Sequence, residues 1–303
     1  MHQYFQNRTK KKIMEYNNKP HVNLENCYFS NEKLDKNGNV YDSTIKNSTF
    51  SEIGFKESKI IQCDFSFCVF IDCYFKNSEI KRINFTGCKF INCIFSGSKL
   101  TFENCDFKYA IFENCYIPYD KMKENLPPEE ENLRSALCRN LSIQCSLQGD
   151  YDNYKLYLFE DRKAGEVHEI RKLFHKTGSY YDKKFNFLEG IGGLFNFLRS
   201  KTSKHLWGYG ERMTTLVRNI ILIIALFSIL YFAIPNCLQI ENQVTTVSFT
   251  DAIFLSITSF FNISTKVLFL SSCGRILWII ENVIGVILIG FFITALFKRI
   301  NRK

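Results

Sequence analysis

The sequence has few of the groups from which enzyme active sites are built. It contains no glycine loop of the kind that binds phosphate and no nucleophile motif. Its five histidines are scattered, at His2, His21, His168, His175 and His205. His168 and His175 could share a helix face, but no carboxylate or cysteine has the spacing to complete a metal site, which favours ordinary surface histidines. We therefore expect no enzyme activity, no catalytic residue, no metal and no cofactor.

The beginning of the chain lacks the apolar core of a signal peptide. Residues 1–20 are polar and include Lys10–Lys12, which predicts a flexible basic arm. A strong charge of either sign is missing from residues 21–117, which hold 12 acidic and 11 basic residues. The net charge of +9 is concentrated in the arm and beside two hydrophobic stretches, which favours attraction to a membrane surface and no nucleic-acid partner.

The twelve cysteines do not predict a disulfide framework. Eight of them occupy the same position of a five-residue repeat, where a small buried residue is expected. These eight are Cys27, Cys63, Cys68, Cys73, Cys88, Cys93, Cys105 and Cys115.

The repeat itself places an apolar residue at every fifth position, with a small residue two positions earlier. A period of five fits neither the 3.6 of a helix nor the 2.0 of a simple strand. The apolar centres of these units are Leu24, Phe29, Leu34, Ile45, Phe50, Phe55, Ile60, Phe65, Phe70, Phe75, Ile80, Phe85, Phe90, Phe95, Leu100, Phe107, Phe112 and Ile117.

This pattern resembles the pentapeptide-repeat family. The resemblance implies a right-handed, four-sided β-solenoid over residues 21–120, with about four units per coil. Residues twenty apart would then stack, so that Phe50, Phe70 and Phe90 form one column. We expect a turn-rich insertion at Asp35–Asp42 and a bulge or corner at Thr101-Phe102. The solenoid serves either as a docking platform for a protein partner or as a rigid domain that sets subunit spacing.

Residues 121–210 predict a helical linker. Pro127-Pro128 opens a helix that presents Leu133, Leu137, Leu141 and Cys145 on one face, and Gly149-Asp150 separates it from a second helix that runs to about residue 175. The string Gly149-Asp150-Tyr151 resembles the linker of pentapeptide-repeat proteins that also carry a pore module. That resemblance implies a fixed coupling between solenoid and membrane. Phe185–Arg199 predicts a helix lying in the membrane interface, with a buried core helix as the alternative.

Residues 211–303 hold two stretches apolar enough to cross a bilayer, Ile220–Ile234 and Ile276–Phe297. Between them lies Ser248–Ser259, which is amphipathic, begins a helix at Thr250-Asp251 and is too short to span. The order of these segments is that of a pore-loop ion channel: a span, a short helix, an extended strip and a second span.

This order resembles the two-transmembrane, potassium-channel-like family. Phe249–Ser256, which includes Asp251, is similar to that family's pore helix, and Cys273–Glu281 to the start of its inner helix. Gly285 stands where a hinge glycine is common, and Gly290 lies further along the same helix. The family's filter, Thr-Val-Gly-Tyr-Gly-Asp, is replaced by Asn262–Val267, and no glycine occurs between Gly210 and Gly274.

The altered strip predicts a wide, hydrated and weakly selective filter lined by Asn262, Ile263, Ser264, Thr265 and Lys266. Four Lys266 ammonium groups facing the axis would favour anions. Alternatively, Lys266 points into the headgroups or pairs with Glu281.

Orientation follows from the basic residues, which precede the first span and follow the second. They predict a multi-pass protein of the cell membrane with both termini cytoplasmic and with Cys237 and Cys273 outside, where the two could pair. Gly208-Tyr209-Gly210-Glu211 looks like a potassium filter but stands before the first span, so it predicts a juxtamembrane elbow.

Two functions remain in competition. The first is a homotetrameric ion channel that conducts inorganic ions through the lipid bilayer and carries a cytoplasmic solenoid. The second is a membrane-anchored scaffold with a degenerate, non-conducting channel module. The polar pair Glu281-Asn282 within a span favours the channel, because a mere anchor has no use for it.

Overall fold

The computed structural model describes residues 8–33, 38–175, 179–233, 238–240, 243–244, 248–263, 267–269 and 272–300. The chain folds as two compact units, Met1–Leu194 and Phe195–Lys303.

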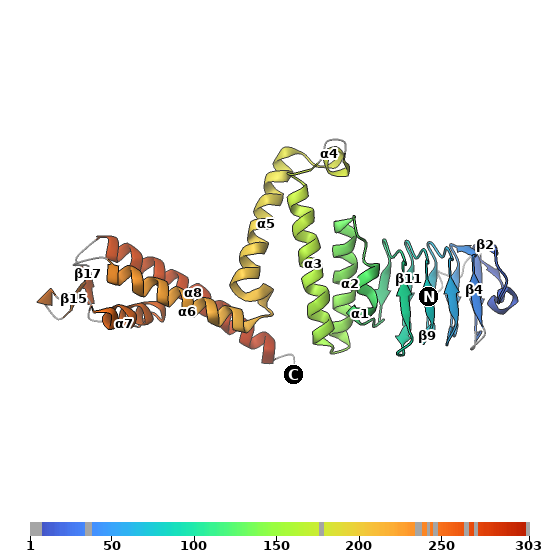
Figure 1. The fold of residues 1–303 in the computed structure, drawn as a ribbon, viewed down its shortest axis with the longest axis horizontal. Helices are drawn as coiled ribbons and strands as arrows, with labels where there is room; N and C mark the ends of the chain where they lie inside the picture. The colour runs from blue at the N-terminus through green and yellow to red at the C-terminus, as the bar shows by residue number, and fades with distance from the viewer. Residues whose placement is uncertain are drawn as a thin grey trace. The chain divides into compact units, whose positions relative to one another are not determined.

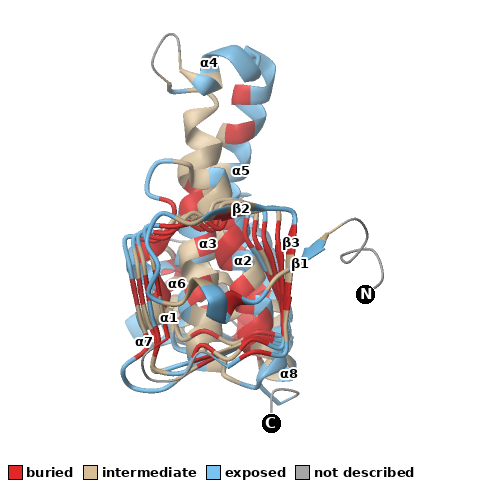
Figure 2. Cartoon of the chain, turned by 90° about the vertical axis from the view of Figure 1, so that its right-hand side faces the viewer, coloured by how far each residue is buried: buried red, intermediate tan, exposed pale blue. Residues whose placement is uncertain are grey.

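The first unit begins with a β-solenoid of about five turns, in which short parallel strands stack from coil to coil (Figure 1). Its strands are β1 (Thr9–Lys10), β2 (Asn23–Glu25), β3 (Cys27–Ser30), β4 (Asn39–Tyr41), β5 (Thr44–Lys46), β6 (Thr49–Ser51), β7 (Lys59–Ile61), β8 (Val69–Ile71), β9 (Tyr74–Lys76), β10 (Glu79–Lys81), β11 (Lys89–Ile91), β12 (Ile94–Ser96), β13 (Thr101–Glu103) and β14 (Ile111–Glu113). They form sheets in the orders β1-β3-β6-β8-β11-β14, β13-β10-β7-β4, β12-β9 and β2-β5. Seen along the stack, the coils superimpose with buried residues along their walls (Figure 2).

The expected stacking at intervals of twenty residues is confirmed. Phe70 pairs in register with Phe50 on one side and Phe90 on the other. The ring centroids are 4.7 Å and 4.9 Å apart, and the rings are nearly parallel. Each of these rings is at most 1 % exposed, so the column is a continuous apolar core.

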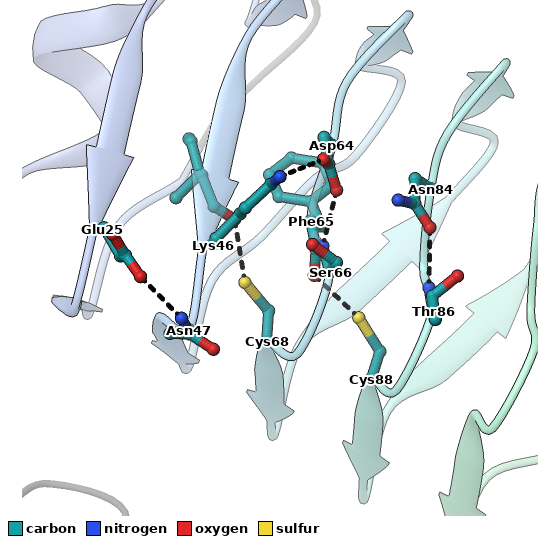
Figure 3. Close-up of polar contacts among 11 residues, drawn as sticks. Glu25, Lys46, Asn47, Asp64, Phe65, Ser66, Cys68, Asn84, Thr86 and Cys88 are labelled. Atoms are coloured by element: carbon teal, nitrogen blue, oxygen red, sulfur yellow. Dashed lines mark hydrogen bonds and ion pairs between the residues drawn. The ribbon is translucent and has the colours of Figure 1, made fainter.

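The small residues face inward as expected, and their thiols bond to the backbone of the preceding coil. The thiols of Cys68 and Cys88 donate to the carbonyls of Ile45 and Phe65, both over 2.9 Å (Figure 3). Burial raises the pKa of the Cys68 thiol to about 12, so this group stays protonated at neutral pH. The cysteines are therefore structural donors in a dry core.

Each corner is formed by a residue with positive φ that directly precedes the small residue. Asn47, Asn77, Asn92 and Asn114 are examples, with φ between 48° and 55°. Asparagine tolerates this left-handed conformation better than most residues, which is why it recurs at the position. The series is a local signal of the coil that sequence analysis missed.

The two expected irregularities are only partly as predicted. Residues 35–37 of the expected insertion lie outside the described residues, and its later part belongs to strand β4. Val40, placed in an insertion, is 1 % exposed and pairs with Ile60 in the sheet. Phe102, placed in a bulge, pairs with Ile80, so the two extra residues belong to the preceding turn at residues 97–99. Gly97, at φ 98°, provides that turn, and both Leu100 and Phe102 point into the core.

The described part of the expected arm is folded onto the solenoid. Strand β1 pairs with β3, and the 3-10 helix η2 (Ile13–Tyr16) follows it. Ile13 is fully buried, and its backbone amide donates to a carboxylate oxygen of Glu32 over 2.8 Å. The strand pairing, the burial of Ile13 and the bond to Glu32 together hold the segment on the solenoid.

Helices close the other end of the solenoid. They are α1 (Tyr119–Met122), η3 (Lys123–Asn125), α2 (Glu131–Leu147) and α3 (Tyr151–Arg171). The Asn140 amide side chain accepts from the Phe112 backbone amide over 2.9 Å and donates to its carbonyl over 3.0 Å. Asn125 makes the same pair of bonds to Cys105 and Phe102 over 2.8 Å and 3.0 Å. These two side chains replace the backbone of a further coil, which protects the last strands.

The predicted antiparallel helix pair is present and contributes to the core. Leu137, Cys138 and Leu141 of α2 are buried against the solenoid, and Tyr157 of α3 donates to the carbonyl of Ile117 over 3.1 Å. Asp150 caps α3 by accepting from the Asn153 backbone amide. The short helix α4 (Tyr180–Lys184) comes next in the chain.

Helix α5 (Phe187–Trp207) crosses the boundary between the units and is longer than expected. No glycine or proline occurs between Arg199, the expected end, and Gly208, whose φ is 60°. A Cβ on Gly193 would lie 2.5 Å from the Glu169 carbonyl oxygen of α3, so this glycine permits close packing. The apolar residues Phe187, Leu188, Ile191, Phe195 and Leu198 are exposed on α5.

The second unit contains two helices long and apolar enough to cross a membrane, α6 (Met213–Ala233) and α8 (Ser272–Ile300). The other elements are η4 (Gly208–Gly210), β15 (Leu238–Ile240), β16 (Gln243–Val244), α7 (Phe249–Phe260) and β17 (Val267–Phe269). Strand β15 pairs antiparallel with both β16 and β17.

Candidate functional site

The candidate site surrounds α7, and hydrogen bonds cap this helix at both of its ends. At its start, the Ser248 side chain and Asp251 form a capping box, with the Ser248 backbone amide donating to Asp251 Oδ2 over 3.2 Å. Ser248 therefore caps the helix, two residues before the expected start at Thr250-Asp251. Asp251 holds the helix end and is exposed.

The end of α7 is closed by Asn262, the first of the predicted filter residues. Its φ is 55°, its backbone amide donates to the Ser259 carbonyl over 3.0 Å, and the Ile263 amide donates to the Thr258 carbonyl over 2.8 Å. This pair of bonds is a Schellman motif. The structure thus gives Asn262 a helix-ending role, which an asparagine after an amphipathic helix signals.

Glu281 joins all three helices of this region. Its side chain is fully buried in the middle of the unit. Tyr231 of α6 donates to its Oε2 over 2.8 Å, and Ser256 of α7 lies 2.5 Å from its Oε1. The Ser256 hydroxyl also lies 2.9 Å from the carbonyl oxygen of Ile224 in α6. A carboxylate in an apolar setting needs such partners, because an unpaired one would be strongly destabilising.

Glu281 is predicted from the sequence, whereas its partners Tyr231 and Ser256 are not. They stand 50 and 25 residues away from it in the chain, and neither forms a spacing pattern with it. A hydroxyl within each apolar segment was the available signal, because polar groups buried there need a partner.

Gly285 lies where α7 meets α8. A Cβ on it would stand 2.1 Å from the Phe260 carbonyl oxygen, so only glycine lets the end of α7 pack this closely. Gly290 has no atom within 4 Å of such a Cβ. Gly285 is therefore required for a close packing contact, whereas a side chain could be added at Gly290 without meeting another atom.

The remaining filter residues Ser264, Thr265 and Lys266 lie outside the described residues, as does Cys237. The next residue, Val267, begins β17 and pairs with Ile240 of β15. The segment between α7 and β17 therefore ends at residue 266. Cys273 is exposed at the start of α8.

The Gly208-Tyr209-Gly210 string forms a tight elbow between α5 and α6, as expected. Tyr209 adopts φ 59° within η4. The elbow is fixed to α8 by an ion pair between Glu211 and Lys298 and by stacking of Trp207 on Phe291 at 4.6 Å. Asn219 of α6 donates to the His205 and Leu206 carbonyls over 2.6 Å and 2.9 Å, which satisfies the end of α5.

Two of the histidines, His168 and His175, make local side-chain contacts. His168 Nδ1 lies 3.0 Å from the Tyr181 hydroxyl, and His175 lies 3.5 Å from Asp182. Burial lowers the pKa of His168. Within the described residues, no group of His, Cys, Asp and Glu side chains has the geometry of a metal site.

A model of the family described as Pentapeptide repeats matches residues 68–101 and 81–117, in 8 copies. The solenoid is built from pentapeptide repeats. The matched residues end before the linker, so the pore-loop module stays a prediction. The handedness of the coil also stays a prediction.

Two solved structures of trypsin-treated variants of QnrB1, a plasmid-mediated fluoroquinolone resistance protein, are also similar to this chain. Each is 20% identical and covers 33% of this chain, with TM-scores of 0.17 and 0.16. The matches cover 54% and 56% of those structures, so the chain spans about half of their length. No curated protein matches the chain.

Proposed function

We propose that the chain is one subunit of a homotetrameric ion channel whose cytoplasmic part is the pentapeptide-repeat solenoid. The observation that carries the proposal is the attachment of α7. This helix is too short to cross a bilayer, lies in sequence between two helices that are long enough, and is held to both by the buried Glu281. A pore helix must be fixed in this way, because its end directs the strip that meets the ions.

The proposed filter is wide and weakly selective. The strip Asn262–Lys266 has no glycine, and potassium-type filters need backbone conformations that glycine adopts easily. Asn262 already uses its left-handed backbone to end α7, so the permeation path falls to Ser264, Thr265 and Lys266. Lys266 decides between anions and cations if its ammonium group faces the axis.

The charge distribution supports a cytoplasmic solenoid. Basic residues lie before α6, at Arg199, Lys201 and Lys204, and in the last turn of α8, at Lys298 and Arg299. Basic residues collect on the cytoplasmic side of membrane proteins. The solenoid then acts as a docking platform for a protein partner or as a spacer between subunits.

The alternative is a membrane-anchored scaffold that conducts nothing. It is favoured by one observation, the pairing of Val267–Phe269 with β15, which leaves few residues for a filter. The fully buried hydrogen-bonded Glu281 favours the channel, since an anchor gains nothing from a carboxylate in its core.

Recordings from the purified protein in a planar bilayer test the proposal. We expect currents that discriminate poorly between potassium and sodium, and a changed anion-to-cation ratio in Lys266→Ala. Lys204→Ala, which removes a charge from exposed α5, is the matched control and should leave the ratio unchanged. Strong potassium selectivity would refute the filter argument, and silence under all gradients would support the scaffold.

A further inference from the structure

The outer face of the six-stranded sheet β1-β3-β6-β8-β11-β14 is shielded from solvent at its centre. Successive side chains of a strand point to opposite sides, so the residues before and after each inward-facing ring point out of the solenoid. On β6 these residues are Thr49 and Ser51, which are 0 % and 8 % exposed. On β8 they are Val69 and Ile71, which are 8 % and 2 % exposed. Four outward-facing side chains are therefore buried.

The same outward positions are open to solvent on the other described strands of the solenoid. On β7, β9, β10 and β12 both outward residues are half-buried or exposed, and Ile94 of β12 is 55 % exposed. Within the six-stranded sheet itself, the outward residues of β3 and β11 are half-buried, and Ile111 of β14 is 47 % exposed. Burial of the outer surface is thus greatest on β6 and β8 and decreases on both sides of them.

Among the described elements, β6 and β8 pack mainly against their neighbours in the same sheet, so no described helix accounts for this burial. Residues 1–7, which lie outside the described residues, are joined to the same sheet at Arg8, directly before the edge strand β1. Nη1 of Arg8 is buried and has no hydrogen-bond partner among the described atoms. Its guanidinium group lies close enough to the thiol of Cys68, directly before β8, to interact with it electrostatically. Arg8 therefore extends from the edge of the sheet toward the buried centre of its outer face.

The spacing of the strands matches the positions of two aromatic residues in the segment 1–7. Neighbouring strands are about 4.8 Å apart, so β6 and β8 lie about 9.6 Å and about 14.4 Å from β1. An extended chain advances about 3.4 Å per residue. Phe5 and Tyr4 precede Arg8 by three and four residues, so an extended segment carries them about 10 Å and about 14 Å across the sheet.

We propose that residues 1–7 bind in extended form across the outer face of the solenoid, with the ring of Phe5 on β6 and the ring of Tyr4 on β8. Val69 and Ile71 give the rings an apolar surface, and burial of two rings stabilises so short a segment. This face is closed to any other protein while the segment is bound. The inference concerns the solenoid alone and does not depend on whether the second unit conducts ions.

Maleimide labelling of introduced cysteines in the full-length protein in detergent tests the proposal. Ser51→Cys on β6 is the probe, and Ser96→Cys, at the matching position of β12, is its control. Both are placed in a Cys237→Ser, Cys273→Ser background, in which the remaining ten native thiols are buried. We expect position 51 to react at least about tenfold more slowly than position 96, because labelling there requires the segment to dissociate.

Two variants of the segment itself show whether its rings cause the protection. Tyr4→Ser, Phe5→Ser should raise the labelling rate at position 51 about tenfold, because the face is then uncovered. Gln3→Ser, Gln6→Ser changes the same segment without removing a ring and should leave that rate unchanged. The rate at position 96 should stay constant in both variants, which shows that the solenoid remains folded.

A disulfide identifies the chain from which the segment comes. Phe5→Cys combined with Ser51→Cys should form a disulfide on mild oxidation, and the product should keep the mass of a single chain under denaturing conditions. A product of twice that mass would overturn the proposal, because the segment would then belong to a second copy. Fast labelling at position 51 with the native segment would also overturn it, as would slow labelling that persists in Tyr4→Ser, Phe5→Ser.

Discussion

At the residue scale, Phe67 and Phe70 stand three positions apart and differ in exposure and in ring contacts. Phe67 occupies a corner with φ 58° and is 58% exposed. Phe70 is 1% exposed and stacks between two other rings. The repeat thus assigns the same amino acid two roles that depend only on its place within a unit of five.

Phe70→Asp should unfold the solenoid. A carboxylate in the ring column costs several kcal/mol, because it loses the apolar contacts and cannot be solvated there. Thermal unfolding followed by circular dichroism, together with limited proteolysis, measures the effect in the full chain. Phe67→Asp is the control, since an aspartate tolerates the exposed left-handed corner, and equal melting of the two variants would contradict the assigned core.

Glu281 gives a second prediction at the residue scale. Glu281→Gln retains an oxygen and an amide that can meet Tyr231 and Ser256, so stability in detergent should fall little. Glu281→Leu removes the carboxylate acceptor of the Tyr231 hydroxyl, whereas Ser256 keeps the Ile224 carbonyl, so the change should cost about 1–3 kcal/mol. Thermal unfolding of the two variants decides, and a leucine variant as stable as the native protein would show that the three helices do not depend on this contact.

At the scale of elements, helix ends carry the specific contacts. The end of α7 touches α8 through the Phe260 carbonyl and Gly285. We expect Gly285→Ala to move α7 and lower stability by about 1–3 kcal/mol, as an overpacked contact does. Gly290→Ala is matched to it on the same helix and should be neutral or stabilising by up to about 1 kcal/mol, because nothing occupies the space. Equal effects in thermal unfolding would remove the close contact.

The solenoid cap gives the other prediction for an element. Asn140→Ala removes both bonds to Phe112 and should destabilise the last coil by about 1–3 kcal/mol. Asn140→Asp keeps an acceptor for the amide but loses the donor, so an intermediate loss is expected. Hydrogen exchange at β14 reports the change, and unchanged protection in the alanine variant would mean that the asparagine is not the cap.

At the scale of the whole molecule, one subunit supplies one α7 and one strip, which cannot enclose a path for ions. Closed fourfold symmetry would supply the missing walls. We therefore expect a tetramer by native mass measurement in mild detergent. A monomer would contradict the channel and favour the scaffold, and a lipid-free preparation controls for mass contributed by bound lipid.

Much of this fold could be predicted because its signals are local and periodic. A period of five with a small residue two positions before each ring specifies the coil, and a long apolar run specifies a candidate span. The sequence does not show whether Leu100 or Phe102 takes the apolar position of the repeat, since both are apolar and both are buried. Their order is decided by which of them meets Ile80 in the sheet.

The candidate site was predictable only in its outline. The carboxylate of Glu281 was conspicuous within an apolar run, whereas its partners depend on how three helices pack. Gly285 was predicted as a hinge on resemblance, and the structure shows a different constraint, the approach of a carbonyl oxygen. Asn140 carried no signal, because a single asparagine within a helix follows no pattern that names a distant strand.

The asparagine caps have a consequence for how this architecture can change in length. The Asn125 and Asn140 side chains bond to backbone groups of the last coil, so their fit does not depend on how many coils precede it. A duplication of twenty residues within the stack would lengthen the domain by one rung of about 4.8 Å and leave the seal at its end intact. Coils can therefore be added to the solenoid or removed from it while the residues that cap its end stay the same.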